Sequence, residues 1–137
     1  MSINNYNNFG VSLGNKKIYV EREFKKLFSL ETYKKAIQKT GPKILYYAEQ
    51  HITTLDLAFD AYKDFIKKNK DFDASKINNL VFVTETNKYD FPANSFLFAS
   101  RLNLKTATRL YDLNLGCTGF VEALDLVFKL NGNSLIV

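Results

Sequence analysis

Apolar residues recur along this chain with two periods, one typical of helices and one typical of strands. The clearest helical pattern covers residues 54–68, where apolar side chains fall every three or four positions. Thr53 and Asp56 have the spacing of a capping box at its start, with Asp in the usual place of Glu. Lysines at its end suit the negative C-terminus of a helix dipole. We therefore predict a capped amphipathic helix over 54–68.

The first third of the chain has weaker patterns. Residues 21–28 carry apolar side chains at helical spacing, and Ser29 is placed to cap a second short helix that ends before Gly41 and Pro42. Short apolar runs at 18–20 and 44–47 predict strands. A short irregular strand is also expected around residues 9–11.

The second half alternates strands and helices. The unbroken apolar run at 80–84 is typical of a strand buried on both faces of a parallel sheet. A helix is expected over 93–102, with Pro92 in its first turn. Further strands are predicted at 108–113 and 134–137. This order predicts an α/β fold with a mostly parallel sheet.

The segment after Cys117 predicts an unusual helix, apolar on nearly all sides. Its polar residues form one narrow stripe of Thr118, Glu122, Asp125 and Lys129. A helix of this kind is buried inside a larger structure. We infer a layer or a partner that these 137 residues do not supply. Because the last predicted strand runs to the final residue, we interpret residues 1–137 as one incomplete domain.

Cys117 is the only cysteine, and it lies where a predicted strand turns into this helix. Gly116 and Gly119 flank it and allow backbone and ligand to approach closely. A helix N-terminus supplies positive dipole and free N–H groups, which suit a nucleophile and an oxyanion. The alternative is that Cys117 is a small buried hydrophobic residue.

Each of four other residues has a structural and a functional interpretation. Lys39 and Thr40 either end a helix or contact a phosphate. Phe91 either packs on its own helix as a staple or lines a pocket. His51, the only histidine, is either a surface residue or the partner of Cys117 in a catalytic pair. One Cys and one His cannot build a zinc site, so no metal is expected.

Composition narrows the function classes. The chain is 46% apolar, which provides ample material for a core, and its formal net charge is +5. The lysines are spread in pairs without a dense tract, which argues against nucleic-acid binding. A single cysteine cannot form an internal disulfide. We find no signal peptide and no apolar run of membrane-spanning length, and we expect a cytoplasmic protein without a membrane partner.

Five stretches in order resemble the ketoacyl-ACP synthase III family of the thiolase-like superfamily. They are Thr40-Gly41, residues 53–58, residues 80–86, residues 89–93 and residues 112–120. The last, Asp-Leu-Asn-Leu-Gly-Cys-Thr-Gly-Phe, is close to the family's motif around its nucleophilic cysteine and is the specific one. The match covers nearly the whole chain, which corresponds to the N-terminal 40–45% of a family member.

The resemblance implies a function and a set of roles. Cys117 would take an acyl group from acyl-CoA and condense it with malonyl-carrier protein, so acyl-CoA and acyl carrier protein are the expected partners and no separate cofactor is expected. Phe91 would close the acyl pocket across a homodimer interface. Thr40 would contact CoA, and Lys39 stands where the family commonly has Arg. The apolar helix would be the central helix of a five-layered fold.

Departures from the family limit this expectation. The chain has no Trp to stack on adenine, and Leu45 and Tyr46 stand where an Arg is expected. The family's catalytic His and Asn lie in its second half. We therefore expect a chain that can be acylated but cannot condense alone, and whether it acts as an enzyme stays open. The alternatives are a non-catalytic subunit that needs a partner, with Cys117 structural, and an unrelated α/β binding domain.

Overall fold

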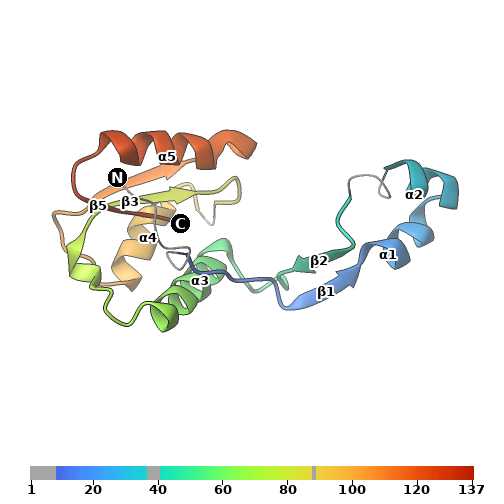
Figure 1. Ribbon diagram of the computed structural model, residues 1–137, viewed down its shortest axis with the longest axis horizontal. Coiled ribbons are helices and arrows are strands. Elements are labelled where there is room, and N and C mark those ends of the chain that lie inside the picture. Colours follow the sequence, from blue (N-terminus) through green and yellow to red (C-terminus); the bar gives the residue numbers. More distant parts are fainter. Residues whose placement is uncertain (1–8, 37–40, 88) are drawn as a thin grey trace. The chain divides into compact units, whose positions relative to one another are not determined.

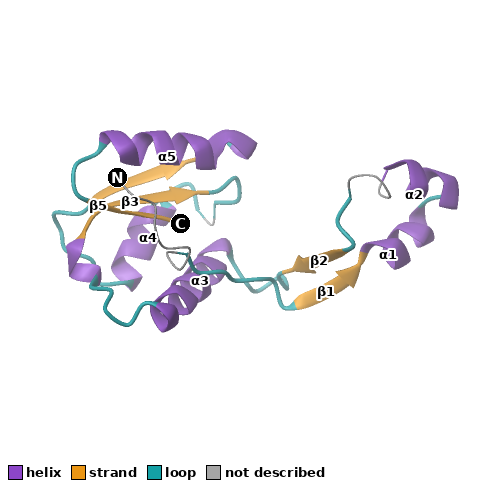
Figure 2. Ribbon diagram, viewed as in Figure 1, coloured by secondary structure: helices purple, strands orange, loops and turns teal. Residues whose placement is uncertain are grey.

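The computed structural model describes residues 9–36, 41–87 and 89–137. These residues form two compact units, which Figure 1 colours along the chain and Figure 2 colours by secondary structure. The smaller unit covers residues 13–52. The larger unit combines residues 9–12 with residues 53–137.

The smaller unit is a two-stranded antiparallel ribbon with two short helices between its strands in the sequence. Its elements are β1 (Lys16–Tyr19), α1 (Val20–Leu27), α2 (Leu30–Ala36) and β2 (Ile44–Tyr47). Ser29 caps α2 as predicted, because its Oγ accepts the N–H of Thr32 at 3.2 Å. The expected strand at 44–47 is confirmed, and the one expected at 18–20 lies at Lys16–Tyr19, because Val20 already begins α1.

The larger unit is a three-stranded parallel sheet between helices. Its elements are α3 (Thr54–Lys68), a 3-10 turn η1 (Ala74–Lys76), β3 (Ile77–Val83), α4 (Asn94–Arg101), β4 (Arg109–Leu113), a 3-10 turn η2 (Gly116–Thr118), α5 (Gly119–Lys129) and β5 (Asn133–Ile136). The strand order is β4-β3-β5, and both pairs are parallel. Figures 1 and 2 show α5 on one face of the sheet and α3 and α4 on the other. The predicted α/β fold with a mostly parallel sheet is confirmed. The expected strand at 9–11 is wrong, because residues 9–11 have no strand conformation.

The core lies along β3, the central strand. Leu80 and Phe82 are almost fully buried on the face toward α3 and α4. There Phe82 meets Phe98 of α4 edge to face, with ring centroids 5.8 Å apart. Leu55 of α3 belongs to the same cluster. Val81, whose side chain points to the opposite face, is also fully buried, which confirms the prediction of a strand buried on both faces.

Helix α5 packs on the sheet by one face only. Gly119 and Ala123 are buried against the sheet, whereas Phe120, Val121 and Phe128 are 59%, 64% and 65% exposed. Within the part of the chain that the structure describes, the apolar outer side of α5 is open. Its burial in a further layer stays a prediction.

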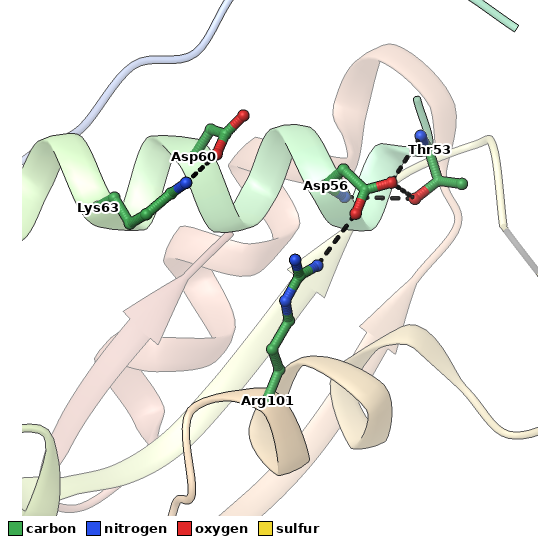
Figure 3. Close-up of polar contacts among 5 residues, drawn as sticks. All are labelled: Thr53, Asp56, Asp60, Lys63 and Arg101. Carbon is green, nitrogen blue, oxygen red and sulfur yellow. Dashed lines mark hydrogen bonds and ion pairs between the residues drawn. The ribbon is translucent and has the colours of Figure 1, made fainter. Parts of the chain in front are cut away.

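Helix α3 begins with the predicted capping box and is tied to α4 at the same point (Figure 3). The Oγ1 and the N–H of Thr53 donate to Asp56 Oδ2 at 2.6 and 3.0 Å. Arg101 of α4 donates to Asp56 Oδ1 at 3.1 Å, and its guanidinium lies over the ring of Phe59 at 4.1 Å. The bonds from Thr53, followed by the bond from Arg101, hold the pKa of Asp56 well below its usual range.

The first prediction concerns the capping box. Asp56→Asn is expected to lower the free energy of unfolding by about 1 kcal/mol, because the N-cap and the tether to α4 are both weakened and the carboxylate is only half-buried. Asp60→Asn is the matched control on the same helix, since Asp60 forms an ion pair with the exposed Lys63 (Figure 3). The control is expected to change stability by less than about 0.5 kcal/mol. Urea denaturation measures both, and equal effects would refute the special role of Asp56.

The same substitution has a defined pH dependence. Because the pKa of Asp56 is lowered in the folded state, its contribution is complete above the ordinary aspartate range near ~4. It is lost as the pH falls through the lower folded-state pKa. The stability difference between the parent and Asp56→Asn should therefore shrink on acidification below pH ~4. A difference that grows under acid would contradict this assignment.

Candidate functional site

Cys117 lies in the turn that joins β4 to α5, as the sequence predicted. β4 ends at Leu113, η2 contains Cys117, and α5 begins at Gly119. Within these residues the thiol is free and exposed. Because β3 and β4 are parallel, this turn stands at the carboxyl edge of the sheet, where open α/β sheets bind ligands.

The two glycines of the turn let it lie directly against the end of β3. Gly116 has a φ of 60°, a conformation that favours glycine, and a Cβ there would lie 2.6 Å from Glu85 Oε1. A Cβ on Gly119 would lie 2.8 Å from Cγ1 of Val83. The position of Cys117 relative to β3 therefore depends on both glycines.

Hydrogen bonds hold the turn and leave the start of α5 uncapped by side chains. Thr118 Oγ1 donates to the carbonyl of Leu115 at 2.9 Å, and the N–H of Thr84 donates to Leu113 O at 3.1 Å. No side chain caps α5. The N–H of Gly119 donates to Gly116 O, whereas the next N–H groups of a helix have no partner within the helix, and its dipole favours negative charge there. The arrangement is suited to stabilise an oxyanion on an acyl group carried by Cys117.

A hydroxyl cluster joins the start of α3 to the loop after β3. The Oγ1 atoms of Thr54 and Thr86 are 2.7 Å apart, and those of Thr84 and Thr86 are 3.1 Å apart. Thr54 Oγ1 also lies 3.1 Å from the carbonyl of Thr86. Sequence reasoning missed this cluster, because only the two threonines that follow the apolar run are a local signal and Thr54 is distant in the sequence.

The loop that carries Phe91 is fixed at its helical end. Asp112 of β4 accepts the N–H of Ser95 at 3.1 Å and also the Ser95 hydroxyl. Asn94 Nδ2 donates to Asn87 Oδ1 at 3.0 Å. The ring of Phe91 is 89% exposed, so it does not pack on α4 as a hydrophobic staple. Phe91 is therefore exposed to solvent just before a helix whose start is held by hydrogen bonds.

The remaining candidates are Lys39, Thr40 and His51. Lys39 and Thr40 lie outside the described residues. His51 is exposed and belongs to the smaller unit, whereas Cys117 belongs to the larger one. A catalytic pair of His51 and Cys117 therefore stays a hypothesis. Among the described residues, acidic, His and Cys side chains form no cluster suited to a metal ion. In the same part of the chain, no helix has both the length and the hydropathy to cross a bilayer.

Comparisons with known proteins identify relatives of this chain. No family model matches the chain. A curated relative is the beta-ketoacyl-[acyl-carrier-protein] synthase III of Neorickettsia sennetsu, 29% identical over 91 residues. Those residues are 66% of this chain and 29% of the relative, so the chain spans less than a third of the relative's length.

Solved structures show the same fold. The 3-oxoacyl-(acyl-carrier protein) synthase of Burkholderia xenovorans is 25% identical with a TM-score of 0.73, covering 90% of this chain and 36% of that one. The synthase III of Thermus thermophilus is also 25% identical with a TM-score of 0.73, over 88% and 36%. The synthase III of Aquifex aeolicus is 20% identical with a TM-score of 0.76, over 94% and 42%, and shows the fold alone. The resemblance to ketoacyl-ACP synthase III and its thiolase-like fold is confirmed.

The second prediction tests the contact of the turn with β3. Gly119→Ala is expected to lower stability by about 1–3 kcal/mol, because the added methyl group meets Val83 in a packed site. In a Val83→Ala background the same change should cost less, with a coupling of at least about 0.5 kcal/mol. Chemical denaturation of the four proteins measures the cycle. Additive effects would show that the two side chains do not compete for this space.

Proposed function

We propose that this chain carries the acyl-accepting part of a ketoacyl-ACP synthase III-like acyltransferase of fatty acid or related acyl biosynthesis. Cys117 is the acceptor. The observation that carries the proposal is the exposed thiol in a glycine-flanked turn between β4 and α5. That turn belongs to a chain similar to synthases of this kind.

The proposed step is a thioester exchange. The Sγ of Cys117 attacks the carbonyl carbon of an acyl-CoA, the bond from that carbon to the CoA sulfur breaks, and the cysteine proton leaves with the CoA thiol. Negative charge develops on the carbonyl oxygen after the attack and before the bond to the CoA sulfur breaks. N–H groups in the first turn of α5, which no side chain caps, would donate hydrogen bonds to that oxygen.

The proposal is confined to acylation. Condensation in the family requires His and Asn groups from its second half, and this chain spans 29% of the curated relative. A carrier protein as the second partner, a homodimer and a cytoplasmic location are parts of the same proposal. The exposure of Phe91 supports the dimer, because an exposed aromatic side chain beside the start of a helix is suited to enter a pocket of another subunit.

A second candidate function is a non-catalytic subunit in which Cys117 is structural. The observation that favours it is the open apolar side of α5, where Phe120, Val121 and Phe128 are more than half exposed. Contiguous exposed apolar surface of this kind marks an interaction site. In this reading a partner covers α5 and no acyl transfer occurs.

The third prediction separates the two functions. Incubation with acyl-CoAs of several chain lengths is expected to give one acyl adduct by intact mass spectrometry, because a single exposed thiol is present. Cys117→Ala should give none. Hydroxylamine should remove the adduct, as expected for a thioester.

Alkylation with iodoacetamide is the control for an accessible thiol. A parent protein that is folded and alkylates at Cys117, yet gains no acyl group from any acyl-CoA, would refute the acceptor role. That result would favour the subunit. An adduct that persists in Cys117→Ala would place the reaction on another residue and would equally refute it.

A further inference from the structure

Glu85 brings a carboxylate to the turn that holds Cys117. Its Oε1 is 2.6 Å from the place where a Cβ on Gly116 would lie. Because a bond from Cα to Cβ spans about 1.5 Å, this oxygen is within about 4 Å of the Gly116 Cα. Consecutive Cα atoms are about 3.8 Å apart, so the same oxygen is no more than about 8 Å from the Cα of Cys117. This separation is within the Debye length at physiological salt.

The main chain on both sides of Glu85 is fixed. The N–H of Thr84 donates to Leu113 O at 3.1 Å, and the N–H of Thr86 donates to Thr84 Oγ1 at 3.1 Å. The Thr86 hydroxyl also lies 2.7 Å from that of Thr54 at the start of α3. The Glu85 side chain is exposed, and among the described residues no hydrogen bond or ion pair takes up its charge. The carboxylate is thus held beside the turn while its charge stays available.

This carboxylate belongs to a local excess of negative charge. The larger unit contains ten acidic and ten basic residues, so it is neutral as a whole. The segments that follow β3 and β4 differ, because residues 84–93 and 112–122 hold four acidic residues and one lysine, and that lysine, Lys88, lies outside the described residues. The cations of β4 and α5 are at the opposite ends of these elements, since Arg109 begins β4 and Lys129 ends α5. The carboxyl edge of the sheet therefore carries an excess of negative charge.

We propose that Glu85 makes the Cys117 site selective for uncharged reactants, so that acyl groups which end in a carboxylate are disfavoured. For acyl groups the inference rests on the proposed acceptor role of Cys117. A carboxylate on the incoming group would lie beside that of Glu85 as the thioester forms, and like charges repel. The phosphates of CoA are separated from its thioester by the pantetheine arm, whose length exceeds the Debye length of about 8 Å. Glu85 therefore acts on the acyl group and hardly on the nucleotide.

The alternative is that Glu85 only fills space against Gly116. The two roles predict different results for Glu85→Gln, because glutamine has nearly the same shape and no charge. Two unit charges about 7 Å apart discriminate by about threefold in water and more strongly at a protein surface. We therefore expect a discrimination of about three- to tenfold against an anionic reactant, which the packing of an uncharged side chain would not produce.

The first measurement uses alkylation, which does not depend on acyl transfer. Iodoacetate and iodoacetamide are nearly equal in size, each forms a thioether with the thiol and releases iodide, and only iodoacetate is charged. The ratio of their rates is compared with that ratio for 2-mercaptoethanol, so effects on the thiol itself cancel. At Cys117 of the parent, iodoacetate should be disfavoured about three- to tenfold, and Glu85→Gln should remove most of this difference.

Asp125→Asn is the matched control, because Asp125 lies farther along α5 and pairs with Lys129 at 2.5 Å. It should leave the ratio of the two alkylation rates unchanged. Glu85→Lys should shift that ratio further in favour of iodoacetate than Glu85→Gln does. A salt titration of the parent needs no variant, since the discrimination should decrease as added salt screens the exposed charge. Thermal melts confirm that each variant is folded.

The second measurement uses acyl-CoAs. Malonyl-CoA and isovaleryl-CoA are nearly isosteric, because a carboxylate in the first takes the place of an isopropyl group in the second. Intact mass spectrometry should show slower acylation of Cys117 by malonyl-CoA. Glu85→Gln should narrow the difference between the two rates by about three- to tenfold, and Asp125→Asn should not.

Two outcomes would overturn the proposal. The first is the same ratio of alkylation rates in the parent and in Glu85→Gln. The second is a shift of that ratio without any change in the relative rates of the two acyl-CoAs, which would exclude an effect on acyl selection. Absence of acylation by either acyl-CoA, together with an alkylation ratio that depends on Glu85, would refute the acceptor role of Cys117 and support charge selection at its thiol.

Discussion

The burial of β3 on both faces is the constraint on which the larger unit depends. Leu80 and Phe82 point to α3 and α4, and Val81 points to the side of α5, each at most 2% exposed. The same strand provides the hydrogen bonds for β4 on one edge and β5 on the other. Loss of its apolar faces would separate both helical layers as well as the sheet, because each layer packs on this one strand.

This constraint also sets the geometry of the candidate site. The parallel pairing of β3 and β4 brings the residues after Val83 beside the residues after Leu113. Gly119 packs on Val83, and the Thr84 N–H continues the pairing to the start of the Cys117 turn. The thiol is thus positioned by the end of a buried strand and not by a free loop, which is how precise sites are built in proteins.

Local signals explain how much of this could be predicted from the sequence. The limits of α3 are predicted correctly because its capping box, its row of apolar side chains and its terminal lysines all indicate the same helix. The Cys117 turn can be predicted because the glycines, the cysteine and the helical pattern follow one another directly in the sequence. The Thr54–Thr86 and Ser95–Asp112 bonds are not found, since they join residues that meet only after the sheet has formed. The expected strand at 9–11 fails for a related reason. The N–H of Val11 donates to Asp64 of α3, so this segment is held by a helix and not by a sheet.

The apolar outer surface of α5 and the open edge of β5 are neighbouring features of the fold. Residues 135–137 are as apolar as the run 80–83, yet they are only half-buried, because β3 has a neighbour on each edge and β5 has one. Phe120 and Phe128 extend from α5 over that same side. Water can satisfy the free main-chain groups of an edge, so the edge alone does not require a partner. Exposed apolar surface, in contrast, is stabilised only when it is removed from water. The apolar surface of α5, more than the free edge of β5, is therefore the part of this side that water leaves unsatisfied.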